Sequence, residues 1–295
     1  METSELLKKV RKIEIKTRGL SKQIFAGEYH SAFKGRGMAF SEVREYQFGD
    51  DIRNIDWNVT ARMDHPYIKI FEEERELTVM ILVDVSGSRE FGSGYQLKKN
   101  IITEIAAVLS FSAIQNNDKI GVILFSDKIE KFISPQKGKK HILRIIRELI
   151  DFYPDNKATN ISEALRYMTN VIKKRCTAFV ISDFIDFDET KNKPAFEEAL
   201  RIANNKHDVV ALKVYDKRET EIPSVGLMRV KDAETGELMW IDTSSKKVRN
   251  VYKEWWNTHI YSINDVLLKT GVDSTLIETD KDYVKPLMQL FKKRA

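Results

Sequence analysis

The pattern of hydrophobic and polar positions changes at Leu77. From there, short apolar runs of strand length alternate with segments whose apolar residues recur at helical spacing. The strand-like runs are 77–83, 119–125, 129–134, 178–182, 209–215 and 274–278. The helical segments are 95–115, 141–150, 160–173, 194–204, 246–268 and 283–293. Pro194 is expected to open the helix in which it lies. This alternation predicts an α/β fold, with a mainly parallel, Rossmann-like sheet of about six strands flanked by helices.

The α/β pattern is interrupted once. Residues 225–230 and 238–243 flank Asp232-Ala-Glu-Thr-Gly236, which predicts an inserted β-hairpin near 224–244. Upstream, residues 4–17 predict an amphipathic helix, 21–64 have the composition of coil, and 67–71 predict a strand. We therefore expect an N-terminal helix and extended arm, 1–76, that packs on a core domain, 77–295.

The arm is rich in charges of both signs. Asp50, Asp51 and Asp56, with Arg44 and Arg53, are expected to form a buried ion-pair network that fixes the arm on the core, because buried charges need partners. A second binding site in the arm is the alternative.

Composition narrows the class of protein. The net charge of +5 comes from 49 basic and 44 acidic residues, and no single element concentrates the basic ones. We therefore expect no nucleic-acid binding, although the basic first 40 residues keep that alternative open. The one cysteine, Cys176, precedes a strand-like run and is expected to be buried. No apolar run reaches the length of a membrane helix, so the sequence predicts a cytoplasmic protein without direct membrane insertion.

Oxygen-bearing side chains follow two of the predicted strands. Asp84, Ser86 and Ser88 come directly after the first buried strand, Asp183 ends another, and Thr159 precedes a helix. Sites in α/β sheets form at the carboxyl ends of strands. Each residue alone could be a helix cap. Together they are hard ligands that suit Mg²⁺, with Mn²⁺ or Ca²⁺ as alternatives.

These five residues resemble the metal-ion-dependent adhesion site of the von Willebrand factor A domain, over residues 77–280. The resemblance implies a protein-binding module rather than an enzyme. It also implies that the hydroxyls bind the metal directly, that at least one carboxylate acts through water, and that one coordination position stays open for a Glu or Asp of the partner.

The N-terminal third carries a second resemblance. The run from Gly35 to Trp57, with Ala61-Arg62 and Asp232–Gly236, is similar to the signature of domain-of-unknown-function family fifty-eight. Members of that family commonly accompany MoxR-type AAA+ ATPases, which the resemblance implies as the partner. Any membrane role would then come through another subunit.

The competing hypothesis is an enzyme, a Mg²⁺- or Mn²⁺-dependent hydrolase that uses Asp84. Against it, the glycine motifs at Gly35 and Gly92 lack the third glycine of a dinucleotide fingerprint. The five histidines are scattered and match no metal or triad spacing. No catalytic residues and no organic cofactor are therefore expected.

Overall fold

The computed structural model describes residues 39–63, 65–72, 77–92, 97–188, 190, 193–231 and 238–294. These residues form two compact units, one up to Leu77 and one from Thr78 onward. The predicted helix at 4–17 and the Asp232–Gly236 turn lie outside the described residues.

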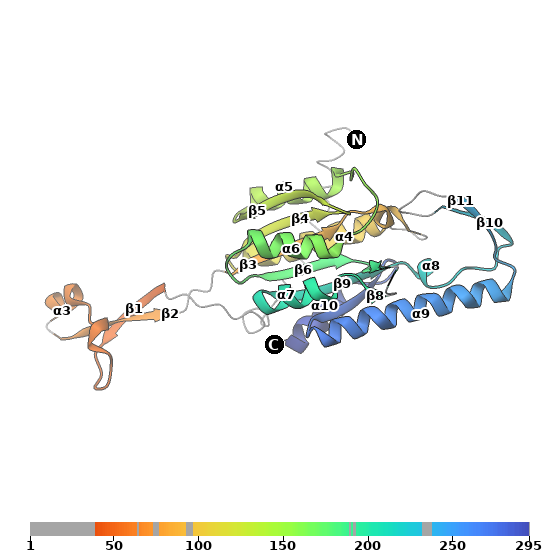
Figure 1. Cartoon of the computed structure of the whole chain (residues 1–295). Helices are drawn as coiled ribbons and strands as arrows, with labels where there is room; N and C mark the ends of the chain where they lie inside the picture. The colour runs from red at the N-terminus through yellow and green to blue at the C-terminus, as the bar shows by residue number, and fades with distance from the viewer. Residues whose placement is uncertain are drawn as a thin grey trace. The chain divides into compact units, whose positions relative to one another are not determined.

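The larger unit is built on a six-stranded sheet in the order β12-β9-β6-β3-β4-β5 (Figure 1). Its strands are β3 (Thr78–Asp84), β4 (Lys119–Phe125), β5 (Ile129–Gln136), β6 (Thr177–Ser182), β9 (Asp208–Tyr215) and β12 (Asp273–Glu278). All neighbours pair in parallel except β5, which runs antiparallel to β4 at one edge. This order is the doubly wound one, so the predicted mainly parallel α/β sheet is confirmed.

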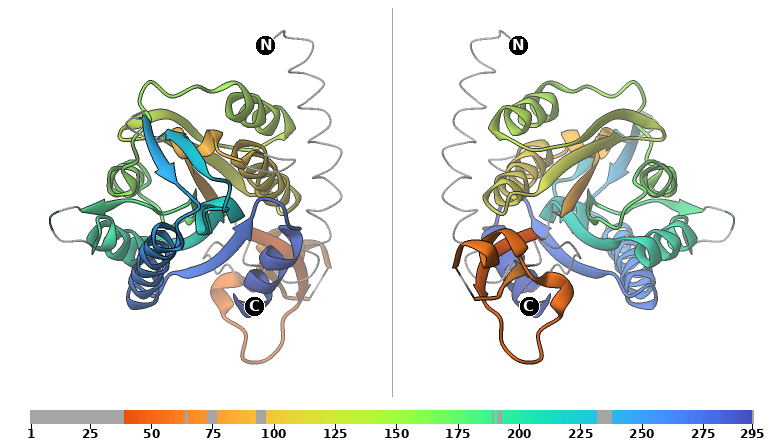
Figure 2. Two further views of the ribbon diagram at one scale, coloured as in Figure 1. Left: turned by 90° about the vertical axis from the view of Figure 1, so that its right-hand side faces the viewer. Right: turned by 90° about the vertical axis from the view of Figure 1, so that its left-hand side faces the viewer.

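Helices cover both faces of this sheet, as the views along the strands show (Figure 2). One layer holds α4 (Lys98–Gln115), α5 (Lys139–Asp151) and α10 (Val284–Arg294), and the other holds α6 (Ile161–Val171), α7 (Glu197–Lys206) and α9 (Lys246–Lys269). Because the central strands are covered on both faces, the side chains of β6 and nearly all those of β3 are buried. That double burial explains their continuous apolar runs.

The start of α7 differs from the expectation. Pro194 belongs to β8 (Lys193–Pro194), which pairs with β7 (Phe187–Asp188), and the helix begins only at Glu197. Residues 195–196 form a turn before the helix, and Phe196, its N-cap residue, packs edge-on against Phe184 with 5.6 Å between the ring centroids. The prediction that Pro194 opens the helix was therefore wrong.

The predicted insertion is confirmed as a hairpin. β10 (Leu227–Lys231) and β11 (Leu238–Asp242) pair antiparallel between the short helix α8 (Lys217–Thr220) and α9. Because β9 leads into α8, the hairpin lies at the end of the sheet where the parallel strands terminate (Figure 1).

The smaller unit is more ordered than the coil predicted for it. β1 (Ala39–Glu45) pairs antiparallel with β2 (Tyr67–Glu72), and between them lie η1 (Ile52–Asn54), a short 3₁₀ helix, and α3 (Trp57–Met63). Only the strand at 67–71 was expected. The partner of β1 lies beyond α3 in the sequence, so local periodicity could not reveal the pairing.

The charged residues of this unit form separate local pairs. Arg44 binds Asp50 with 2.8 Å between nitrogen and oxygen, Arg53 binds Asp51, and Lys69 lies 3.6 Å from Asp56. The partners are half-exposed or exposed, up to 86% for the side chain of Arg53. The predicted buried network is therefore wrong, because solvent reaches pairs formed on tight turns, and such pairs contribute little stability. Packing of 1–76 on the core stays a prediction.

Cys176 is buried beside His207, as the sequence predicted for the thiol. Burial raises the pKa of Cys176 to about 12. The backbone N–H of Cys176 donates to Nδ1 of His207, and Nε2 has no hydrogen-bond partner among the described residues. Burial, with Lys206 and Arg175 nearby, lowers the pKa of His207 to about 4.

This histidine predicts a loss of stability in weak acid. Its folded pKa lies below the unfolded value of about 6.5, so the unfolded chain binds the proton first as the pH falls. His207 should therefore lower the free energy of unfolding progressively from about pH 6.5 to pH 4, by up to roughly 3 kcal/mol. Urea unfolding of wild type and His207→Leu across this range measures the effect. The same pH dependence in both proteins would contradict it.

Candidate functional site

Asp84 is fixed at the carboxyl end of β3. It is 3% exposed; its Oδ1 accepts the N–H of Ser86 at 2.9 Å, and its Oδ2 accepts the hydroxyl of Ser182 at 2.6 Å. Ser182 ends the neighbouring strand β6. The adjacent ends of two parallel strands therefore hold the carboxylate in one orientation.

The loop after β3 presents two hydroxyls. The Oγ atoms of Ser86 and Ser88 lie 3.3 Å apart, and the hydroxyl of Ser88 helps to lower the pKa of Asp183. Between them, the N–H of Gly87 donates to the carbonyl of Lys157 at 2.8 Å. A short 3₁₀ turn, η2 (Gly87–Glu90), gives the loop its shape.

Thr159 belongs to the loop that leads into α6. Two backbone hydrogen bonds fix this loop. The carbonyl of Lys157 accepts the N–H of Gly87, and the carbonyl of Ser126, directly after β4, accepts the N–H of Asn160. The side chain of Asn160 caps α6 by accepting the N–H of Glu163 at 2.9 Å. Thr159 is half-buried, and its loop lies beside the serine loop.

Asp183 follows β6 in a tight turn. Its Oδ1 accepts the N–H of Ile185 at 3.2 Å, while Phe184 adopts a left-handed φ of 63°. That conformation is costly for a bulky residue and persists because the Phe184 ring is fully buried. The turn brings Asp183, Asp84 and Ser88 together at one edge of the sheet.

Two residues of this cluster were not predicted. Lys98, in the first turn of α4, is 2% exposed, and its Nζ lies 3.1 Å from Oδ2 of Asp183 and 2.6 Å from Oε1 of Glu219 in α8. Glu219 forms a capping box with Asp216, a buried carboxylate that follows β9. The Asp-x-x-Glu spacing could have revealed Glu219. Nothing in the sequence distinguishes Lys98 from the exposed lysines.

The electrostatics follow from this packing. Burial and then the nearby Asp183 raise the pKa of Asp84 to about 6. Burial alone raises the pKa of Asp183, but Lys98 and Ser88 outweigh it and bring that pKa below its ordinary value. For Glu219, burial and Asp183 prevail over Lys98, so its pKa is raised. With all four groups charged, three carboxylates against one ammonium leave a formal charge of −2.

Arg89 does not point into solvent. It is 2% exposed, and its guanidinium donates to the carbonyl of Phe152 at 3.0 Å. Burial lowers its pKa, against the opposing attraction of Glu90, Asp84 and Tyr153. It therefore adds positive charge within electrostatic reach of Asp84 from inside the fold.

Comparison with known proteins adds the family. The model of "Protein of unknown function DUF58" matches residues 42–260. The chain belongs to the DUF58 family. An uncharacterised protein of Mycobacterium tuberculosis, Rv1480, is 24% identical over 296 residues, which cover 100% of this chain and 91% of that protein. An uncharacterised Mycobacterium avium protein is 23% identical over 46% of the chain and 76% of its own length.

Solved structures resemble this DUF58 chain in fold. A conserved hypothetical protein, BatB, of Bacteroides thetaiotaomicron has a TM-score of 0.48 at 17% identity, covering 74% of this chain and 98% of that one. A von Willebrand factor type A protein of Catenulispora acidiphila has a TM-score of 0.38 at 11% identity, covering 77% and 43%. At these identities the likeness to BatB and to the von Willebrand factor type A protein concerns the fold alone.

The donor set of this DUF58 protein fits a hard divalent cation. Two buried carboxylates and the neighbouring hydroxyls are oxygen ligands of the kind that Mg²⁺ and Ca²⁺ prefer. A charge of +2 would match the formal charge of −2 in the cluster. No three His, Cys, Asp or Glu side chains gather into a metal cluster within the described part of the chain, so the hydroxyls would have to serve as ligands.

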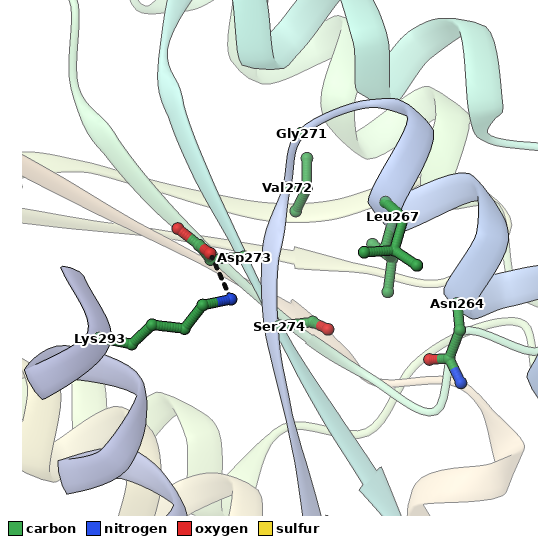
Figure 3. Close-up of a pocket in the computed structure, with 8 residues that line it drawn as sticks. Asn264, Leu267, Gly271, Val272, Asp273, Ser274 and Lys293 are labelled. Carbon is green, nitrogen blue, oxygen red and sulfur yellow. Dashed lines mark ion pairs between the residues drawn. The ribbon is translucent and has the colours of Figure 1, made fainter.

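A hollow of about 460 Å³ lies at the other end of the sheet (Figure 3). It is lined by residues between the end of α9 and the start of β12, including Gly271 and Asp273, with Lys293 of α10 at 3.7 Å from Asp273. Parallel strands place their amino ends opposite their carboxyl ends, so this hollow is separate from the candidate site. Among the described residues, no helix is long and apolar enough to cross a membrane.

Proposed function

We propose that this DUF58 protein is a metal-dependent protein-interaction module. Its site holds one divalent cation, with Mg²⁺ expected and Mn²⁺ or Ca²⁺ as alternatives, and the ligands are Asp84, Ser86, Ser88, Thr159 and Asp183. The observation that carries the proposal is the convergence of Asp84, Asp183 and both serine hydroxyls at one edge of the sheet.

The same geometry supports an acidic group on the partner. The five proposed ligands leave one position of an octahedral Mg²⁺ site open, which water or a partner oxygen can fill. A carboxylate competes well with water there, because a charge-assisted ligand is stronger than a neutral one. The buried Arg89 adds to the positive field that a partner carboxylate would meet.

The family supplies the candidate partner. By the resemblance noted in the sequence, members of this family commonly accompany MoxR-type AAA+ ATPases, so we infer a cytoplasmic adaptor of such an ATPase. In this arrangement the ATPase presents a Glu or Asp to the cation, and the DUF58 chain supplies recognition rather than catalysis.

The test is binding to a purified MoxR-type ATPase from the same organism, with and without Mg²⁺. We expect chelation to weaken binding by about tenfold or more, because the metal-bridged carboxylate contact is lost. Ser86→Ala should have the same effect with an unchanged circular dichroism spectrum. Ser274→Ala, an exposed serine at the start of β12, is the matched control and should bind normally.

Equal affinity in the presence and absence of Mg²⁺ would contradict the proposal. The cluster would then serve the fold alone, and the contact surface would lie elsewhere.

A further inference from the structure

One face of the inserted hairpin is open to solvent at every position. Residues opposite each other in an antiparallel pair share a face, and the register pairs Leu227 with Asp242, Arg229 with Trp240, and Lys231 with Leu238. All six side chains are exposed. Leu227 is 67% exposed, Trp240 65% and Leu238 53%, so the face presents three large apolar side chains to water.

The opposite face is also apolar. Met228, Val230 and Ile241 are half-buried, and Met239 is 51% exposed. A two-stranded hairpin is marginally stable by itself in water, and three strands or a packed face are usually needed. A two-stranded hairpin with apolar side chains on both faces is therefore stabilised when another surface packs against one of them. Such patches mark interaction sites.

The hairpin is joined to the candidate metal site by a chain of contacts. Lys98 links Asp183 to Glu219 of α8, and the hydroxyl of Tyr252 in α9 donates to the carbonyl of Glu219. Arg249, also in α9, binds the carbonyls of Thr243 and Ser244 at the base of the hairpin. The hairpin thus lies at the same end of the sheet as the site (Figures 1 and 2).

The charges on the open face have one predominant sign. Arg229 and Lys231 form no ion pair with any described residue. Asp242 already accepts the N–H of Ser244 at 3.0 Å, and Lys246 and Lys247 are exposed at the start of α9. Basic side chains next to Leu227, Leu238 and Trp240 match a partner surface that is apolar and acidic.

The sequence favours a protein over a bilayer as the occupant. The residues that join the two strands include three carboxylates, Asp232, Glu234 and Glu237. A continuous anionic membrane surface would face these carboxylates together with the basic side chains. A short peptide segment can instead place its own carboxylates against Arg229 and Lys231 alone.

We propose that the open face of the hairpin docks an acidic amphipathic segment of a partner protein. Apolar side chains of the segment contact Leu227, Leu238 and Trp240, and its carboxylates pair with Arg229 and Lys231. This deepens the proposed function by adding a second contact beside the metal site, and it requires no metal of its own.

The probe is a synthetic amphipathic peptide of leucine and glutamate, titrated against the full chain by fluorescence anisotropy. A peptide with lysine in place of glutamate and vesicles of anionic lipid are parallel arms. We expect saturable binding of the glutamate peptide, weaker by about tenfold in Trp240→Ala and in Arg229→Glu, since aromatic and arginine side chains dominate interfaces. Arg229→Lys should retain most of the affinity.

Two controls separate this inference from the metal site. Trp57→Ala removes a tryptophan of similar exposure, 70%, from the smaller unit and should bind normally. Ser86→Ala and chelation should also leave peptide binding unchanged. Equal binding of both peptides, stronger binding to vesicles, or no effect of Trp240→Ala would overturn the inference while leaving the metal-dependent function testable.

Discussion

Replacing Lys98 with methionine is expected to destabilise the folded protein by about 3–5 kcal/mol, because it removes one partner of a buried ion pair. The ammonium is 2% exposed and lies between the carboxylates of Asp183 and Glu219. Burial by itself lowers the pKa of Lys98, but the two carboxylates outweigh it and raise that pKa. Methionine fills a volume similar to that of lysine, so the loss of stability would come from the missing charge and not from a cavity. Urea denaturation measures it.

Matched variants make this expectation specific. Lys128→Met removes an exposed lysine that pairs with Asp155 and should leave the unfolding midpoint almost unchanged. Glu219→Gln in the Lys98→Met background removes one of the stranded carboxylates and should restore part of the stability. An unfolding midpoint of Lys98→Met equal to that of wild type would contradict this prediction. It would mean that water reaches Lys98, Asp183 and Glu219 in solution.

Most of the sheet could be predicted because its strands are buried on both faces. Runs such as 77–83 and 178–182 are apolar throughout, and that pattern survives in the sequence without knowledge of the neighbours. The same logic placed Asp84 and Asp183 at one edge, since carboxyl ends of parallel strands meet. The fold and the two carboxylates of the site therefore follow from local pattern and a topological rule.

The parts that were missed depend on contacts distant in sequence. Lys98 lies 85 positions from Asp183, and its role arises only when α4 and the turn after β6 pack together. Likewise, β1 has no strand-like periodicity that stands out, and its pairing with β2 appears only in three dimensions. Arg44 and Asp50 could be paired from the sequence, but their exposure could not be judged.

Binding of one Mg²⁺ is expected to stabilise the wild-type protein, and Ser86→Ala and Asp84→Asn should lose this effect. A ligand that binds only the folded state adds about 2.7 kcal/mol at a hundred times its Kd. Isothermal calorimetry should give one site in the wild type and none in either variant. Asp265→Asn, which removes an exposed carboxylate paired with Lys269, is the control and should bind as wild type does. No binding at about millimolar Mg²⁺ would contradict the metal site.

The Lys98 variant provides the sharper form of this experiment. Removing the ammonium makes the cluster more negative by one charge, so Mg²⁺ should bind Lys98→Met more tightly than wild type even though the metal-free variant is less stable. The midpoint of thermal unfolding should therefore rise more with Mg²⁺ in Lys98→Met than in wild type. If the cluster serves the fold alone and binds no metal, Mg²⁺ should leave the midpoint of thermal unfolding unchanged in both proteins. Combining Lys98→Met with Ser86→Ala should abolish this stabilisation by Mg²⁺, since the cation needs the hydroxyl ligands as well as the negative charge.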